Sequence, residues 1–155
     1  MKRTLCLAFE WLRWIVVIVA LQMAYANYPN ISNIFPLVAF LTVFTIAGLS
    51  GTESLFLSDA AQKITGYKPS GYQGQCGLFF YALALTSLII FAFKWGVKSS
   101  LVVLLLTLIF LLFSSINHLY SAIKEGTGKF RSIYLRFGGT MLLVGAFLPI
   151  IINVL

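Results

Sequence analysis

Long apolar runs separated by short polar segments dominate the chain, and five of these runs are long enough to cross a bilayer. A hydrocarbon core about 30 Å thick requires roughly 20 apolar residues in a helix. Backbone in lipid must satisfy its own hydrogen bonds, and the runs lack the alternating pattern of a membrane barrel. The pattern therefore predicts an all-α membrane protein, a bundle of five transmembrane helices over residues 5–26, 34–57, 75–93, 99–123 and 135–155.

The segments between the predicted spans are short and rich in residues that favour turns. The longest, residues 58–74, begins with Ser58 as the expected N-cap of a short helix and continues with the turn residues Gly66, Pro69 and Gly71. The other connections are residues 27–33, 94–98 and 124–131. Because no linker, repeat or low-complexity segment interrupts residues 1–155, we expect a single transmembrane domain.

The composition narrows the classes of function. Hydrophobic residues make up 60% of the 155 residues and charged residues 10%, with a mean hydropathy of +0.96. A soluble domain of this size cannot hide so much apolar surface from water, so a soluble enzyme and a disordered segment are excluded. The net charge of +7 does not indicate a nucleic-acid partner, because the basic residues lie between the apolar runs instead of covering one face.

The distribution of Lys and Arg predicts the orientation in the membrane. Cytoplasmic loops carry an excess of basic residues, and this bias sets the topology. A cytoplasmic N-terminus and an external C-terminus place only Lys94 and Lys98 outside. We expect the membrane to be the inner (plasma) membrane of a cell. The predicted cytoplasmic residues are Lys2, Arg3, Arg13, Lys63, Lys68, Lys124, Lys129, Arg131 and Arg136.

The first span has an alternative interpretation as a cleaved signal peptide. Lys2 and Arg3 would form its basic region, and Ala24-Tyr25-Ala26 would form a small-x-small cleavage site. The acidic Glu10 and the length of the run favour a retained helix instead. In a retained helix, Glu10 and Arg13 are three residues apart and are expected to pair near the inner interface.

The two cysteines fall at the inner ends of their spans in this topology. Cys6 opens the first span and Cys76 opens the third, so both face a reducing compartment. A structural disulfide is therefore not expected. A quinone-linked disulfide oxidase is disfavoured, because such an enzyme would need cysteine pairs on the outer side.

Polar residues of four predicted spans fall in one layer, the cytoplasmic third of the bundle. Polar groups in hydrocarbon are costly and by default indicate a functional site. We expect Glu53 to pair with Arg136, and His118 to exchange a proton with Glu53. Glycines at 48, 51, 138 and 139 are expected to let helices approach closely around this layer. We expect His118, Glu53, Gln73 and Gln75 to face inward. The candidate binding residues of this polar cluster are Glu53, Gln73, Gln75, Asn117, His118 and Arg136.

Structural roles are an alternative for each of these residues. Glu53 could pair with a loop lysine, His118 could be a hydrogen-bonded anchor beside Asn117, and Arg136 could extend to lipid headgroups. The sequence shows no metal-ligand spacing and no phosphate loop, so we expect no metal and no cofactor. Several aromatic residues are expected at the membrane interfaces before they are considered for binding: Trp11, Trp14, Tyr67, Tyr72, Trp95 and Tyr120.

The loop before the third span carries a recognisable motif, Gly66-Tyr67, Pro69-Ser70 and Tyr72-Gln73-x-Gln75. It resembles the Gly-Trp, Pro-Ser, Phe-Gln-x-Glu signature of an uncharacterised family of small prokaryotic multi-pass membrane proteins of unknown function. Members of that family carry a His near the end of the next-but-one span, which Asn117-His118 would match. The likeness runs from about Ile34 to the C-terminus.

The chain departs from the family pattern at positions that bear on chemistry. Tyr67 and Tyr72 replace Trp and Phe, which are mild changes. Gln75 replaces a Glu, so a carboxylate is lost, and Glu53 falls near a family His. The resemblance therefore implies the architecture and no specific activity.

Three classes of function remain. The first is a non-enzymatic accessory or scaffold component of a membrane complex, whose partners would be lipid, other membrane proteins or further copies of the chain. The second is a small carrier or sensor that uses the polar cluster. The third is a membrane-embedded enzyme with Glu53 and His118 as an acid-base pair, although no nucleophile or metal set accompanies them.

Overall fold

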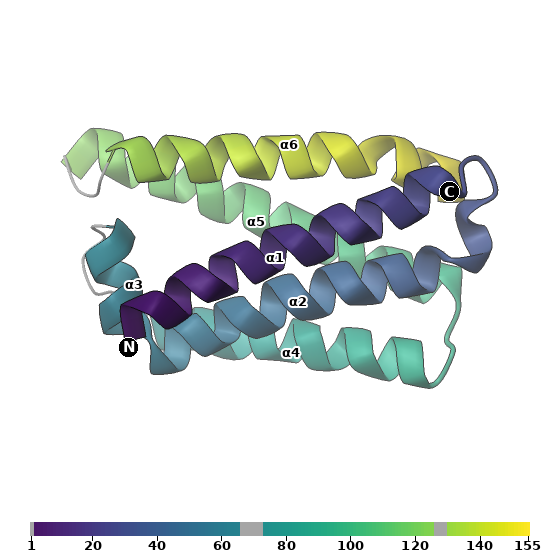
Figure 1. Ribbon diagram of the computed structural model, residues 1–155, viewed down its shortest axis with the longest axis horizontal. Helices are drawn as coiled ribbons and strands as arrows, with labels where there is room; N and C mark the ends of the chain where they lie inside the picture. Colours follow the sequence, from purple (N-terminus) through teal and green to yellow (C-terminus); the bar gives the residue numbers. More distant parts are fainter. Residues whose placement is uncertain (1, 66–72, 126–129) are drawn as a thin grey trace.

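The computed structural model describes residues 2–65, 73–125 and 130–155, and every element in these ranges is helical. Five of the helices are long and apolar enough to cross a membrane, which confirms the predicted bundle (Figure 1). The two termini lie at opposite ends of it. The elements are α1 (Lys2–Ala26), the 3-10 helix η1 (Ile31–Asn33), α2 (Phe35–Phe56), α3 (Ser58–Thr65), α4 (Gln73–Ala92), α5 (Val97–Glu125) and α6 (Phe130–Val154).

The observed helices extend past some of the predicted spans. Helix α1 begins at Lys2 and α6 begins at Phe130, five residues before the predicted start at position 135. An apolar run defines only the part of a helix inside hydrocarbon, and the helix can continue through polar residues into the headgroup region. The predicted short helix is α3, with Ser58 as its first residue, whereas Gly66, Pro69 and Gly71 lie outside the described residues.

Helix α2 lies at the centre of the bundle and contacts α1, α4 and α5 (Figure 1). Helix α6 packs mainly on α5, and α1 lies beside α2 and passes in front of α5 in the view of Figure 1. The central position follows from the composition of α2, which carries small or apolar residues on several faces. Its fully buried side chains include Phe35, Val38, Ala39, Val43 and Ala47.

A glycine contact brings α2 and α4 close together, as the sequence predicted for Gly51. A Cβ atom placed on Gly51 would lie 3.1 Å from the carbonyl oxygen of Gly77, and one placed on Gly77 would lie 2.8 Å from Cγ of Leu55. Neither position therefore has room for a larger side chain without displacement of its neighbour. Gly48 is less restrictive, because its Cβ would make an ordinary contact with Ala84 at 3.9 Å.

Buried hydroxyl groups in α4 and α5 satisfy themselves within their own helices. Ser87 Oγ donates to Ala84 O, Ser100 Oγ to Gly96 O, and Thr107 Oγ1 to Val103 O. Thr42 of α2 is 0% exposed, but its Oγ1 has no hydrogen-bond partner within the described parts of the chain. An unpaired buried hydroxyl reduces the free energy of unfolding.

The short link between α4 and α5 ends α4 in a specific hydrogen-bonded turn. The amide of Trp95 donates to Ile90 O at 3.0 Å, and the amide of Lys94 donates to Phe91 O at 3.2 Å. This is the Schellman arrangement, which needs a residue in the left-handed conformation and usually has Gly there. Here Lys94 takes that place with φ of 53°.

Candidate functional site

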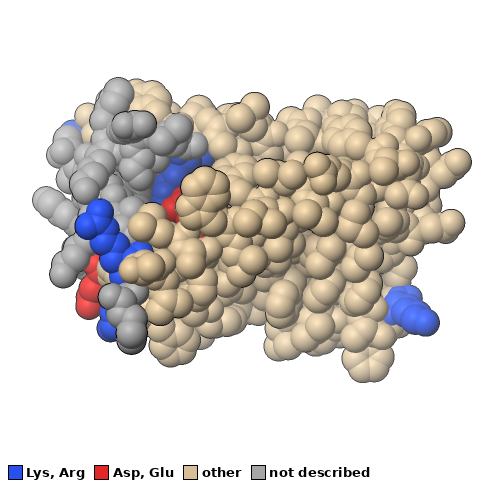
Figure 2. All heavy atoms as spheres, in the orientation of Figure 1, with Lys and Arg blue, Asp and Glu red and all other residues tan. Residues whose placement is uncertain are grey.

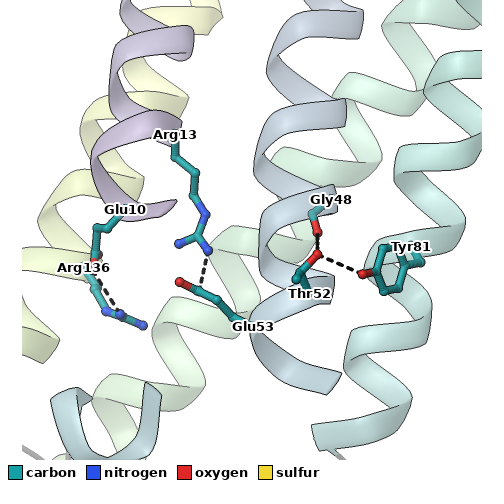
Figure 3. A network of polar contacts seen from close by, with 7 residues as sticks. All are labelled: Glu10, Arg13, Gly48, Thr52, Glu53, Tyr81 and Arg136. Carbon is teal, nitrogen blue, oxygen red and sulfur yellow. Dashed lines mark hydrogen bonds and ion pairs between the residues drawn. The ribbon is translucent and has the colours of Figure 1, made fainter. Parts of the chain in front are cut away.

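Four charged side chains gather at the end of the bundle where α1 and α6 begin and α2 ends, here called the charged end. Arg13 of α1 donates to Glu53 of α2, and Arg136 of α6 pairs with Glu10 of α1 at 3.6 Å between Nη2 and Oε2 (Figure 3). We call these four residues the charged cluster. Glu53 and Arg136 belong to the polar cluster expected from the sequence, and the charged cluster joins three helices.

The partners within the charged cluster differ from those expected. The sequence predicted that Glu53 pairs with Arg136 and Glu10 with Arg13, and both predictions are wrong. Residues three apart on a helix are separated by about 60° around its axis, since each residue turns about 100°. This separation lets Glu10 reach α6 and Arg13 reach α2, although the same spacing also permits a pair within α1.

The two ion pairs differ in burial. The Arg13 and Glu53 side chains are 16% and 14% exposed, whereas those of Arg136 and Glu10 are 39% and 36% exposed. A mostly buried pair cannot lose one partner without stranding the other charge away from solvent. The exposed pair contributes little, because its ions remain solvated when they separate. The connection between α1 and α2 is therefore the stronger one.

The Arg13 guanidinium is not fully satisfied by Glu53. Its Nε is buried and has no hydrogen-bond partner within residues 2–65, 73–125 and 130–155. Cys6, also on α1, is buried in a small cluster with Leu57 and Ala60, which attaches the start of α3 to α1. Both observations show that one face of the first half of α1 is buried at the charged end.

A second polar bridge joins α2 to α4 next to the charged cluster. Thr52 Oγ1 donates to Gly48 O and lies 2.8 Å from Tyr81 Oη (Figure 3). The Tyr81 ring also lies against Gly51. This bridge was not predicted from the sequence, because Thr52 and Tyr81 are two of many residues of the same types in apolar helices. The close approach predicted from Gly51 is the one signal that pointed to this region.

The remaining candidate residues lie near the charged end but do not all face inward. Gln73 and His118 are half-buried, whereas Gln75 and Asn117 are exposed. The expectation that Gln75 faces inward is therefore wrong. The predicted proton exchange between His118 and Glu53 stays a prediction.

Helices α1 and α6 make two further contacts that the sequence did not reveal. The Trp14 ring lies over Gly139, where a Cβ atom would come within 3.0 Å of Cζ2. Farther along, Tyr25 Oη donates to Ala146 O at 2.8 Å. Gly139 thus makes room for the Trp14 ring, whereas a Cβ atom on Gly138 would meet open space.

The surface separates charge from apolar area. Figure 2 shows the acidic and many of the basic side chains at one end, a broad uncharged band, and basic atoms at the opposite end. The helices beneath this band have the length and hydropathy of membrane spans. The chain is a multi-pass membrane protein. The helices that border the band contact the lipid bilayer.

Comparison of the chain with models of protein families, with characterised proteins and with solved structures finds no match. Among the described residues, no three His, Cys, Asp or Glu side chains gather as metal ligands. The charged cluster holds α1 against both α2 and α6 through charges of opposite sign.

Proposed function

We propose that this membrane protein is a non-enzymatic accessory or scaffold component of a membrane complex. The main support for the proposal is the pairing of the charges within the charged cluster. Both carboxylates of the cluster are engaged by arginines of neighbouring helices, so the charges connect elements of the bundle. An acid-base pair for catalysis would instead need a carboxylate available to a substrate.

The lipid-facing surface supports the same proposal. Large apolar side chains project from several helices, with Leu142 76% exposed, Phe113 66% and Val102 65%. Such side chains can contact lipid tails or the helices of a partner equally well. A scaffold subunit needs a wide apolar surface of this kind and no chemistry of its own.

The proposal includes the orientation and organisation predicted from the sequence. The N-terminus would be cytoplasmic in an inner (plasma) membrane, and residues 1–155 would form one transmembrane domain. One hydrophobic core that draws residues from all five spanning helices supports the single domain. Retention of α1 is supported by the burial of Val17, Ala20 and Ala24, the last within the alternative cleavage site. Membership of the family with the Gly-Trp and Pro-Ser loop motif rests on the sequence resemblance alone.

A small carrier or sensor is the second candidate, and one observation favours it. Arg13 combines a 16% exposed side chain with an Nε donor that has no partner in the described residues. An anionic ligand that reached Arg13 would gain a charged hydrogen-bond donor. Such a ligand would compete with Glu53 and loosen α1 from α2.

Purification of the tagged chain from its native membrane in a mild detergent tests both candidates. The scaffold proposal expects a stoichiometric partner protein that also recovers this chain in the reciprocal purification. A chain that purifies alone with a bound anionic small molecule would support the carrier or sensor instead. A chain that purifies alone and without ligand contradicts both. A five-helix membrane protein with the same tag serves as the control for non-specific capture.

A further inference from the structure

We propose that the charged end binds anionic phospholipid headgroups through Lys2, Arg3 and Lys124. The proposal is independent of the scaffold function, since it concerns basic residues that the charged cluster does not use. Lys2 and Arg3 form the first turn of α1, and Lys124 lies in the last turn of α5. All three side chains are exposed.

The excess of basic over acidic residues supports this proposal. The chain has 11 basic residues against four acidic ones, and two of the acids, Glu10 and Glu53, are occupied by Arg136 and Arg13. Across the ranges that the structure describes, Lys2, Arg3 and Lys124 form no ion pair. These exposed charges are therefore available to an anion outside the bundle, and a phosphodiester of the adjoining leaflet is the nearest such anion in a membrane.

The aromatic residues near these bases also support contact with lipid headgroups. Lys124 Nζ lies 5.3 Å from the centroid of the Tyr120 ring, and Tyr120 is 59% exposed. On α1, Trp11 follows the basic turn and is 71% exposed. Amphipathic rings of this kind lie at the level of the headgroups, and lysine stems extend from the apolar region so that the amines reach the phosphates.

The position of the bases favours lipid over an acidic protein or a nucleic acid. Lys2 and Arg3 at the start of α1 are well separated from Lys124 at the end of α5 (Figure 1). In the view of Figure 2, Lys and Arg atoms at the charged end lie next to the uncharged band. Bases spread around the rim of a membrane bundle fit several separate headgroups better than one macromolecular partner.

Quenching of tryptophan fluorescence by lipids with brominated acyl chains tests the proposal on the full chain. Substitution Trp95→Phe leaves Trp11 and Trp14, both on α1 toward the charged end, as reporters. The protein is reconstituted in vesicles with brominated phosphatidylglycerol or brominated phosphatidylcholine. We expect phosphatidylglycerol to associate about fivefold more strongly, the contribution of one basic residue near the surface. The preference is expected to vanish at 1 M salt, where the screening length is about 3 Å.

Two variants distinguish the proposed residues from the remaining charge. Combined substitution Lys2→Gln, Arg3→Gln and Lys124→Gln is expected to make the two lipids equivalent. The matched control, Lys94→Gln with Lys98→Gln, removes bases at the opposite end and should keep the full preference. Both variants change exposed side chains, so circular dichroism should show unchanged helix content.

Three results would overturn the proposal. They are equal association of the two lipids with the parent chain, an unchanged preference in the triple variant, or an equal loss in the control. Excess inorganic phosphate should leave the preference intact, because the proposed ligand is held in the leaflet. Displacement by free phosphate would assign the bases to a soluble anion. Salt-sensitive co-purification of an acidic protein, in the absence of a lipid preference, would assign them to a protein partner.

Discussion

Arg13 on α1 donates a hydrogen bond to Glu53 on α2, and the two side chains are only 16% and 14% exposed. The charged groups are 40 residues apart in the sequence, so the pair fixes tertiary structure and not local helix geometry. It also fixes the rotation of α1, because Glu10 must face α6 at the same time. The stability of the bundle should therefore respond unequally to loss of each charge.

Removal of one member of the Arg13–Glu53 pair is expected to destabilise the protein strongly. Arg13→Gln leaves Glu53 charged and mostly buried, which costs about 3 kcal/mol of unfolding free energy. Combination of Arg13→Gln with Glu53→Gln removes both charges and should recover part of the loss. Unfolding in mixed micelles of SDS and a mild detergent measures both variants against the parent chain.

The exposed pair supplies the matched control. Arg136→Gln breaks the contact with Glu10, whose side chain is 36% exposed, and should cost no more than about 1 kcal/mol. Equal losses for Arg13→Gln and Arg136→Gln would contradict the assigned difference in burial. Additive losses in the double variant would show that Arg13 and Glu53 are not coupled.

The α2–α4 contact should not tolerate a methyl group at Gly77. A Cβ atom added at Gly77 would lie 2.8 Å from Cγ of Leu55 and 3.1 Å from Cβ of Ser54, so Gly77→Ala is expected to cost about 1–3 kcal/mol. The control is Gly145→Ala in α6, where a Cβ atom meets nothing within 4 Å and helix propensity alone favours Ala. Thermal unfolding in detergent should show a lower midpoint for the first variant only. A neutral Gly77→Ala would mean that α2 and α4 separate easily.

Thr42 should be replaceable by valine without loss. The two side chains have nearly the same shape, and the buried Thr42 hydroxyl has no partner in the described residues, so Thr42→Val removes only an unpaired polar group. We expect an unchanged or higher unfolding midpoint. Thr107→Val is the contrast, because it deletes a bond of 2.8 Å to Val103 O and should cost about 1 kcal/mol. A drop for Thr42→Val as large as that for Thr107→Val would show that Thr42 has a partner of its own.

Replacement of Lys94 by glycine is expected to raise the free energy of unfolding. Its φ of 53° is left-handed, a conformation that costs a residue with a Cβ atom about 1–2 kcal/mol. Part of this gain is offset by the greater freedom of Gly in the unfolded chain, so Lys94→Gly should stabilise by about 0.5–1 kcal/mol. Lys94→Gln removes the same charge but keeps the Cβ atom, and it should leave the unfolding free energy unchanged. A similar gain in both variants would assign the effect to charge.

The sequence predicted the number of spans, because a membrane imposes a length on every apolar run. It also predicted that charge would collect at one end, since Glu53 and Arg136 fall at defined distances along their runs. It did not predict which charges pair. That choice depends on the rotation of each helix, and apolar side chains on most faces of a membrane helix leave this rotation undefined in the sequence. The Trp14–Gly139 and Thr52–Tyr81 contacts were missed for the same reason.

The wide spacing of Arg13 and Glu53 along the chain has a consequence for synthesis. Arg13 leaves the ribosome 40 residues before Glu53, so α1 reaches the membrane with a guanidinium that has no carboxylate from α2 beside it. Burial of an unmatched charge is costly, and the cost is removed only when α2 arrives. The two helices should therefore enter the bilayer together, as a hairpin closed by the short turn that contains η1. Truncated nascent chains that end before Glu53 would leave α1 poorly inserted.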